Sequence, residues 1–351
     1  MSKNYITYVL LIIGLQLSSC SSSSDPEETL PVSFQMQPES NNPNFITFIA
    51  TSATEGATYE WTFSHSNQKQ TGSHVTVYFE HKGSYEVTLK QTAGGMEGST
   101  TRKVNVATDS YYAQQGEQLW WHDEFEGARL DNTSWNYDTG IGKWGNNEWQ
   151  NYTNKADNSF LRNGCLVIKA LKTGEGQQIG DYTSARLTTK GKRELNRGRV
   201  EVRAKMPSGV GLWAAIWLFG TKAQPYYSEL DLLEYVGCDQ NIIYGAVHTT
   251  ETLEGTQKIS EQRTVTDVET AFHTYGLLWS DNQIEYYLDT PDNVFLTFTP
   301  TDKSDPRCWP FDKELYLILN LAVGGDWGGM RGVDDTIFPR EMEVDYVRIF
   351  K

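Results

Sequence analysis

Hydrophobic and polar residues alternate with a period of two along most of the chain, which predicts β-strands. Polar turns at 64–72 and 80–83 separate the first of them. The helical period is confined to one short stretch at 267–272. About seven short strands in some seventy residues predict an immunoglobulin-like sandwich over 31–107. The clearest of these strands are 45–49, 58–63, 74–79, 84–89 and 100–106.

The same alternation resumes after a linker at 108–116 and continues to the last residue, 351. It predicts an all-β second domain over 117–351, a two-sheet β-sandwich of jelly-roll type whose curved inner sheet forms a cleft. Its expected strands include 166–170, 199–204, 212–218, 243–248, 274–279, 284–288, 315–322 and 342–350.

One strand of the second domain carries three acids inside an apolar run. Ser228 to Gly237 reads Ser-Glu-Leu-Asp-Leu-Leu-Glu-Tyr-Val-Gly. Residues i and i+2 of a strand share a face, so Glu229 and Asp231 point the same way. Glu234 joins them only if a β-bulge at Leu232 or Leu233 adds one residue. Carboxylates are rarely buried without a partner or a task. The alternative is a solvated strand face with charges placed by chance.

Two acids on one face suit glycoside hydrolysis. A retaining enzyme needs a nucleophile and a proton donor about 5–5.5 Å apart, and two glutamates leaning together from one strand can reach that separation. A third acid between them crowds like charges, which raises pKa values and keeps one carboxyl protonated near neutral pH.

The Glu-x-Asp-x-x-Glu motif resembles the active-site signature of family-16 glycoside hydrolases, in the bulged form found in laminarinases. The resemblance covers about residues 116–351. It implies a concanavalin A-like jelly roll, with Glu229 as nucleophile, Glu234 as general acid/base and Asp231 as the assisting acid. It implies that catalysis requires no cofactor.

The resemblance also implies a set of sugar-binding residues, whose amides would bond hydroxyls and whose indoles would stack on sugar faces. For each aromatic member, burial in the sandwich core is the alternative. The chain departs from the family pattern at Lys143, Ala214 and Asp326, and the expected loop at 249–254 lacks the Tyr-Asn-His of many relatives. The implied residues are Trp144, Asn147, Glu148, Arg186, Trp213, Trp217, His248, Gln257 and Trp327.

These features predict an endo-acting hydrolase of β-1,3-glucan, with mixed β-1,3/1,4-glucan as a further substrate. One alternative keeps the retaining chemistry and changes the sugar to the β-galactosidic linkages of algal galactans or mucin glycans. Another is a surface glycan-binding protein without chemistry, although such a protein has no need for all three acids. Reducing-sugar release from a glycan panel separates the three.

The first residues predict the compartment. An apolar run at 8–17 follows Lys3 and ends in Leu-Ser-Ser-Cys at Cys20, which resembles a bacterial lipoprotein box. This predicts a signal peptide at 1–19, a lipid anchor on Cys20, a polar tether at 20–30 and display on the outer membrane. The alternative is an ordinary cleaved signal in which Cys20 is incidental.

The net charge of −15 disfavours nucleic acid as a partner and leaves a polysaccharide and the membrane. A monomer is expected. Residues 59–63 and 83–89 resemble PKD-type domains, which implies a spacer, with carbohydrate binding as the alternative. The family resemblance also implies a structural Ca²⁺ at Glu126, Gly164 and Asp345. Cys165, Cys238 and Cys308 are an odd set, which argues against a disulfide framework.

Overall fold

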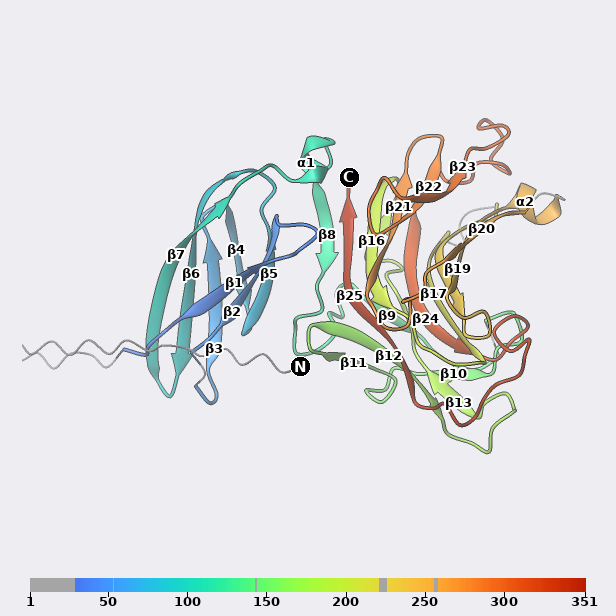
Figure 1. The fold of residues 1–351 in the computed structure, drawn as a ribbon, viewed down its shortest axis with the longest axis horizontal. Helices are drawn as coiled ribbons and strands as arrows, with labels where there is room; N and C mark the ends of the chain where they lie inside the picture. The colour runs from blue at the N-terminus through green and yellow to red at the C-terminus, as the bar shows by residue number, and fades with distance from the viewer. Residues whose placement is uncertain (1–28, 53, 143, 221–225, 256–257) are drawn as a thin grey trace, which may run out of the picture.

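The computed structural model describes residues 29–52, 54–142, 144–220, 226–255 and 258–351. It shows two β-sandwiches side by side, the smaller one N-terminal (Figure 1). The prediction of an all-β chain is therefore confirmed. Within the described residues, no helix has the length and apolarity that a membrane crossing requires.

The N-terminal module packs a three-stranded sheet, β1-β2-β5, against a four-stranded sheet, β4-β3-β6-β7. Its core is aromatic and β-branched, and Trp61 is completely buried with its indole N–H donating to the Gly72 carbonyl. The strands are β1 (Phe34–Pro38), β2 (Phe45–Ala50), β3 (Thr58–Phe63), β4 (Ser66–Thr71), β5 (His74–Tyr78), β6 (Gly83–Ala93) and β7 (Met96–Val106).

One expectation for this module is wrong. The polar stretch 64–72 was expected to be a turn, but most of it forms β4 as an edge strand beside β3. The sequence of β4 is Ser-Asn-Gln-Lys-Gln-Thr, without an apolar residue, because neither of its faces is buried in the core. Backbone pairing alone, with Glu60 opposite Thr71, defines the strand, so the hydrophobic pattern could not reveal it.

The second domain has an outer sheet of ten strands. Its main order is β10-β13-β12-β25-β16-β21-β22-β23, with β11 beside β12 and β8 beside β25. Its strands are β8 (Leu119–Asp123), β10 (Gln150–Tyr152), β11 (Ser159–Arg162), β12 (Cys165–Lys172), β13 (Tyr182–Ser184), β16 (Gly198–Lys205), β21 (His273–Trp279), β22 (Ile284–Leu288), β23 (Val294–Phe298) and β25 (Arg340–Phe350).

An inner sheet of eight strands completes the jelly-roll sandwich, in the order β20-β19-β18-β17-β24-β14-β9, with β15 beside β24. This sheet carries the three acids, on β18. Its strands are β9 (Asn136–Asp138), β14 (Arg186–Thr188), β15 (Glu194–Leu195), β17 (Leu212–Gly220), β18 (Ser228–Val236), β19 (Ile242–Thr249), β20 (Ile259–Thr264) and β24 (Leu315–Val323).

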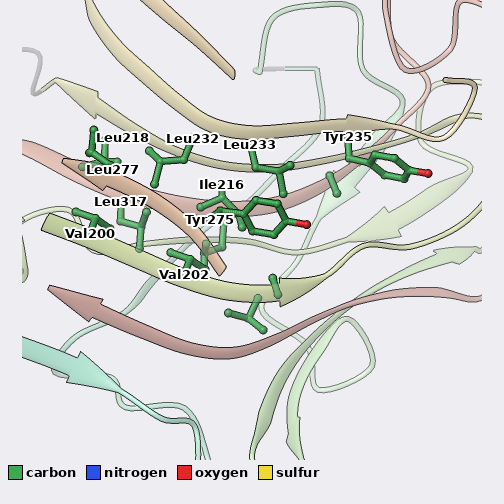
Figure 2. Packing of buried hydrophobic residues seen from close by; sticks show 14 of the residues in the cluster. Val200, Val202, Ile216, Leu218, Leu232, Leu233, Tyr235, Tyr275, Leu277 and Leu317 are labelled. Carbon is green, nitrogen blue, oxygen red and sulfur yellow. The ribbon is translucent and has the colours of Figure 1, made fainter. Parts of the chain in front are cut away.

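The core lies between the two sheets. Figure 2 shows side chains of the inner sheet, among them Ile216 and Leu232, facing Val202 and Leu277 of the outer sheet. Alternate residues of β17 enter this core, so the others, including Trp213 and Trp217, lie on the opposite face. We call that opposite face of the inner sheet the catalytic face.

The two domains meet at a junction that contains stacked rings, buried ion pairs and hydrogen bonds. The short helix α1 (Tyr111–Gln114) lies in the segment expected to be a linker, and its Tyr112 stacks on Phe350 with ring centroids 3.8 Å apart. Arg348 of β25 is fully buried and forms ion pairs with Glu39 of the N-terminal module and Glu124 of the second domain. Thr76 donates two hydrogen bonds to the Glu126 carboxylate, at 2.6 and 2.7 Å.

Candidate active site

The bulge in β18 is present where the sequence predicts it. Pairing with β19 matches Asp231 to Ala246 and Glu234 to Tyr244, so Leu232 and Leu233 of β18 together oppose the single residue Gly245 of β19. The pairing with β17 shifts at the same place. Leu232 and Leu233 both enter the core, as Figure 2 shows, because an extra residue interrupts the alternation. The bulge therefore returns Glu234 to the face of Glu229 and Asp231.

Burial gives the three acids unusual proton affinities. Asp231 is 4% exposed, and burial followed by the charges of Glu229 and Glu234 raises its pKa well above the usual range. Burial and the Glu229 charge raise the pKa of Glu234 to about 7. Burial also raises the pKa of Glu229, against the opposing effects of a Tyr227 hydrogen bond and the Arg186 charge. Such a set can hold one proton donor and one ionised nucleophile near neutral pH.

Each glutamate has an aromatic donor. The Tyr227 hydroxyl donates to Glu229 Oε2 at 2.8 Å, and the Trp213 indole donates to Glu234 Oε1 at 3.1 Å. His248 Nε2 lies 3.3 Å from Asp231 Oδ2 and 4.0 Å from Glu229 Oε1. Burial, together with the Lys258 charge, lowers the pKa of His248, which favours the neutral imidazole at this position.

Arg186 connects two predicted sugar-binding aromatics. Its guanidinium lies 5.0 Å from the Trp144 ring centroid and 4.7 Å from that of Trp217, and it pairs with Asp138 at 3.2 Å. The Trp217 indole donates to Asn320 Oδ1 at 2.7 Å. Arg186 thus contacts both indoles, and Trp217 lies opposite Asp231 in the pairing of β17 with β18.

Glu148 lies inside the protein and is 8% exposed. Its Oε2 accepts a hydrogen bond from Gln150 at 2.6 Å and a long one from the Tyr152 hydroxyl at 3.5 Å. Tyr152 in turn accepts from Asn320, the partner of Trp217. The structure thus places Glu148 at the base of a hydrogen-bond chain that ends on the catalytic face.

Two other predicted binding residues lie at the end of the sheet near Glu234. Trp327 makes edge contacts with Trp213 and Tyr244, at 5.3 and 4.9 Å between centroids. Asn147 donates to Asp326 Oδ1 at 2.8 Å, so Asp326, which replaces the family asparagine, accepts a hydrogen bond here. Lys143 and Gln257 lie outside the described residues, so their roles stay predictions.

The segment expected to be a loop after β19 is the helix α2 (Thr250–Glu254). Thr249 and Thr252 form a reciprocal capping box at its N-terminus, with hydrogen bonds of 2.8 and 3.2 Å. Capping residues of this kind stabilise a first turn. The prediction of a loop at 249–254 is therefore wrong, because this capping pair starts a helix.

Two sets of residues could hold a cation. Glu126, Gly164 and Asp345 line one cavity of about 660 Å³ at the domain junction, on the side of the sandwich away from the three acids. Their oxygens are of the type that Ca²⁺ prefers, although Arg203 already pairs with Asp345. Within the described residues, ligand atoms of Glu229, Asp231 and His248 also lie within 4.8 Å of one another. A cation there would occupy the carboxylates that hydrolysis needs.

Sequence reasoning missed several neighbours of the acids. Tyr227 lies two residues before Glu229, so the period of a strand could have placed it on the same face. Asn320 and Asp138 come from other strands, and only strand pairing brings them to the catalytic face.

A jelly-roll sandwich with two glutamates and a buried aspartate on one aromatic face defines a glycoside hydrolase. The model of "Glycosyl hydrolases family 16" matches residues 146–348 of the chain. The chain therefore belongs to glycoside hydrolase family 16.

The relatives agree with this membership. A β-glucanase of Rhodothermus marinus is 40% identical over 248 residues, covering 67% of this chain and 85% of the relative. A glucan endo-1,3-β-glucosidase of Cryptopygus antarcticus is 34% identical, covering 65% and 90%. Among solved structures, the laminarinase from Flavobacterium sp. UMI-01 has a TM-score of 0.60 and 39% identity, covering 67% of this chain and all of that one.

Proposed function

We propose that the protein is a retaining endo-β-glucanase that hydrolyses β-1,3-glucan of the laminarin type and also accepts mixed β-1,3/1,4-glucan. The observation that carries this proposal is the bulged strand β18, which gathers Glu229, Asp231 and Glu234 on one face among tryptophans. The names of the relatives, a β-glucanase and two enzymes of β-1,3-glucan, support the choice of sugar.

The proposed reaction has two steps. Glu229 attacks the anomeric carbon while Glu234, whose pKa of about 7 keeps much of it protonated, gives its proton to the leaving oxygen. A water molecule then attacks the glycosyl-enzyme, with Glu234 accepting the proton and the Glu229 carboxylate leaving. Asp231, buried between the two glutamates, stays largely protonated and limits the repulsion between them.

The test is a digestion panel with laminarin, lichenan, agarose and a keratan-type glycan. We expect reducing-sugar release from laminarin, less from lichenan, and an initial product with the β-anomeric configuration by NMR. Release from agarose or the keratan-type glycan alone would replace the glucan by a β-galactosidic substrate. Release from none of the four would favour a glycan-binding protein, and an inverted anomer would exclude the retaining scheme.

We also propose a structural calcium ion at Glu126, Gly164 and Asp345, supported by the convergence of the three on one cavity. It would stabilise the domain junction and take no part in hydrolysis. We expect Ca²⁺ to raise the unfolding temperature of the chelated protein, and the Asp345→Asn variant to lose that rise. An identical rise in the variant would rule out the site.

We further propose that the protein is a monomeric lipoprotein of the outer membrane, anchored through Cys20 and exposed at the cell surface, with a PKD-like spacer at 31–107. The lipobox-like sequence before Cys20 and the acidic tether after it support this proposal. External protease should remove the protein from intact cells. Complete protection would contradict surface display, and unchanged membrane association of Cys20→Ala would contradict the anchor.

A further inference from the structure

We propose that Tyr227 is a positioning residue for the nucleophile, holding one oxygen of the Glu229 carboxylate so that the other is free to attack. The Tyr227 hydroxyl donates to Glu229 Oε2 at 2.8 Å. Glu229 Oε1 has His248 Nε2 at 4.0 Å, beyond hydrogen-bond reach. Within the part of the chain that the structure describes, the two oxygens are therefore not equivalent, and Oε1, which has no donor there, is the one available to the anomeric carbon. The inference rests on Glu229 being the nucleophile.

The backbone and the ring of Tyr227 are both held in place. Its N–H donates to the Thr250 hydroxyl at 2.9 Å, which ties the start of β18 to the first residue of α2. Its ring meets Phe219 of β17 edge to face, with centroids 5.6 Å apart. The side chain is 38% exposed, on the same side as Glu229. Two contacts from two elements thus aim the hydroxyl at the carboxylate.

The hydroxyl remains a donor at working pH, because the pKa of a tyrosine lies far above neutrality and burial and the Glu229 charge raise that of Tyr227 further. A donor to a carboxylate favours the ionised form. The groups that face Glu229 are Tyr227, Asp231 and Glu234 from its own strand, His248 from β19 and Arg186 from β14. Among them Tyr227 makes the direct hydrogen bond to the nucleophile, whereas Arg186 acts through its charge.

The effect of the Tyr227 hydrogen bond changes as the Glu229 carboxylate loses and regains its charge during the reaction. When Oε1 bonds to the anomeric carbon, the leaving oxygen takes the Glu234 proton, and Oε2 becomes the carbonyl oxygen of a neutral ester. In the second step, water forms the new bond to the anomeric carbon, its proton goes to Glu234, and the carboxylate charge returns. Because the Tyr227 hydrogen bond is stronger to the charged carboxylate than to the ester, it favours release of the sugar.

The test compares Tyr227→Phe with Tyr226→Phe, which removes the adjacent hydroxyl, in the full chain acting on laminarin. A hydrogen bond to a charged group predicts a fall in kcat of roughly ten- to a hundred-fold for Tyr227→Phe, with KM changed less than about three-fold. The acid limb of its kcat/KM profile should move to higher pH, since the nucleophile loses the group that favours its ionised form. Tyr226→Phe should match the wild type.

The readouts separate positioning from other roles. An unmoved acid limb, or a higher KM with unchanged kcat, would overturn the proposal and make Tyr227 a sugar-binding residue. A large loss of unfolding temperature in Tyr227→Phe with an unmoved limb would make it structural and would equally overturn it. Failure of the wild-type protein to hydrolyse any of the four glycans would instead reject the proposed function.

Discussion

The molecule buries two clusters of carboxylates, and they differ in their counter-charges. On the catalytic face, Glu229, Asp231 and Glu234 are buried together. Their direct partners are the hydroxyl of Tyr227, the indole of Trp213 and the imidazole of His248, whose lowered pKa favours its neutral form. At the domain junction, Glu39 and Glu124 hold the fully buried Arg348 between them. Both clusters remove charge from water, but only the second supplies a guanidinium in direct contact.

The proton affinities diverge accordingly. Burial and the Glu229 charge raise the pKa of Glu234 to about 7, whereas at the junction Arg348 and His122 overcome the burial of Glu124 and lower its pKa to about 2. Glu39 shares Arg348 but keeps a raised pKa, because its burial outweighs the ion pair. Glu124, whose pairing outweighs its burial, stays ionised and serves structure. A buried carboxylate without a cation can exchange a proton, and this is what the catalytic face needs.

The largest effect should come from removing the nucleophile. Glu229→Gln keeps the shape of the side chain but cannot form the glycosyl-enzyme, so kcat on laminarin should fall by at least ~10³. Glu261→Gln, at an exposed position on the neighbouring β20, is the matched control and should keep full activity. Near wild-type turnover in Glu229→Gln would show that Glu229 is not the nucleophile and that this cluster of carboxylates is not the reactive one.

The junction cluster should respond in stability. Arg348→Met leaves two buried carboxylates without their cation, which should cost about 3–5 kcal/mol of unfolding free energy in urea titrations. The control is Arg162→Met, at an exposed pair with Glu341, which should cost within about 1 kcal/mol. Equal losses in the two variants would show that the buried pair contributes no more than a surface one.

The pH dependence of kcat/KM should carry the smallest but most specific effect. Activity requires Glu234 protonated and Glu229 ionised, so the rate should fall on the alkaline side through a pKa of about 7 and on the acid side as Glu229 takes up a proton. Purified protein on laminarin, with unfolding temperature followed in parallel, checks this. A rate that rises steadily above pH 8 would contradict the assignment of Glu234 as acid.

The sequence is most informative on β18, where the chemistry requires three acids on one face and the period of two of a regular strand does not allow it. Three acids among leucines require a bulge, and pairing with β19 confirms it. It predicts a turn in place of β4, whose residues bury nothing, and a loop in place of α2, although the capping box of α2 is a local signal for a helix. It could not reveal the Glu39–Arg348 pair, because these residues are 309 positions apart and meet only through domain docking. Local pattern predicts elements, whereas long-range partners come from tertiary structure.

The most direct test of the claim that the catalytic cluster, which has no guanidinium in direct contact, is the reactive one is to label the protein with 2-deoxy-2-fluoro-β-laminaribiosyl fluoride and to map the adduct by peptide mass spectrometry. The account predicts one adduct, on the peptide containing Glu229, and none in the Glu229→Gln variant. An adduct on a different residue, or none on a protein that hydrolyses laminarin with inversion, would contradict it.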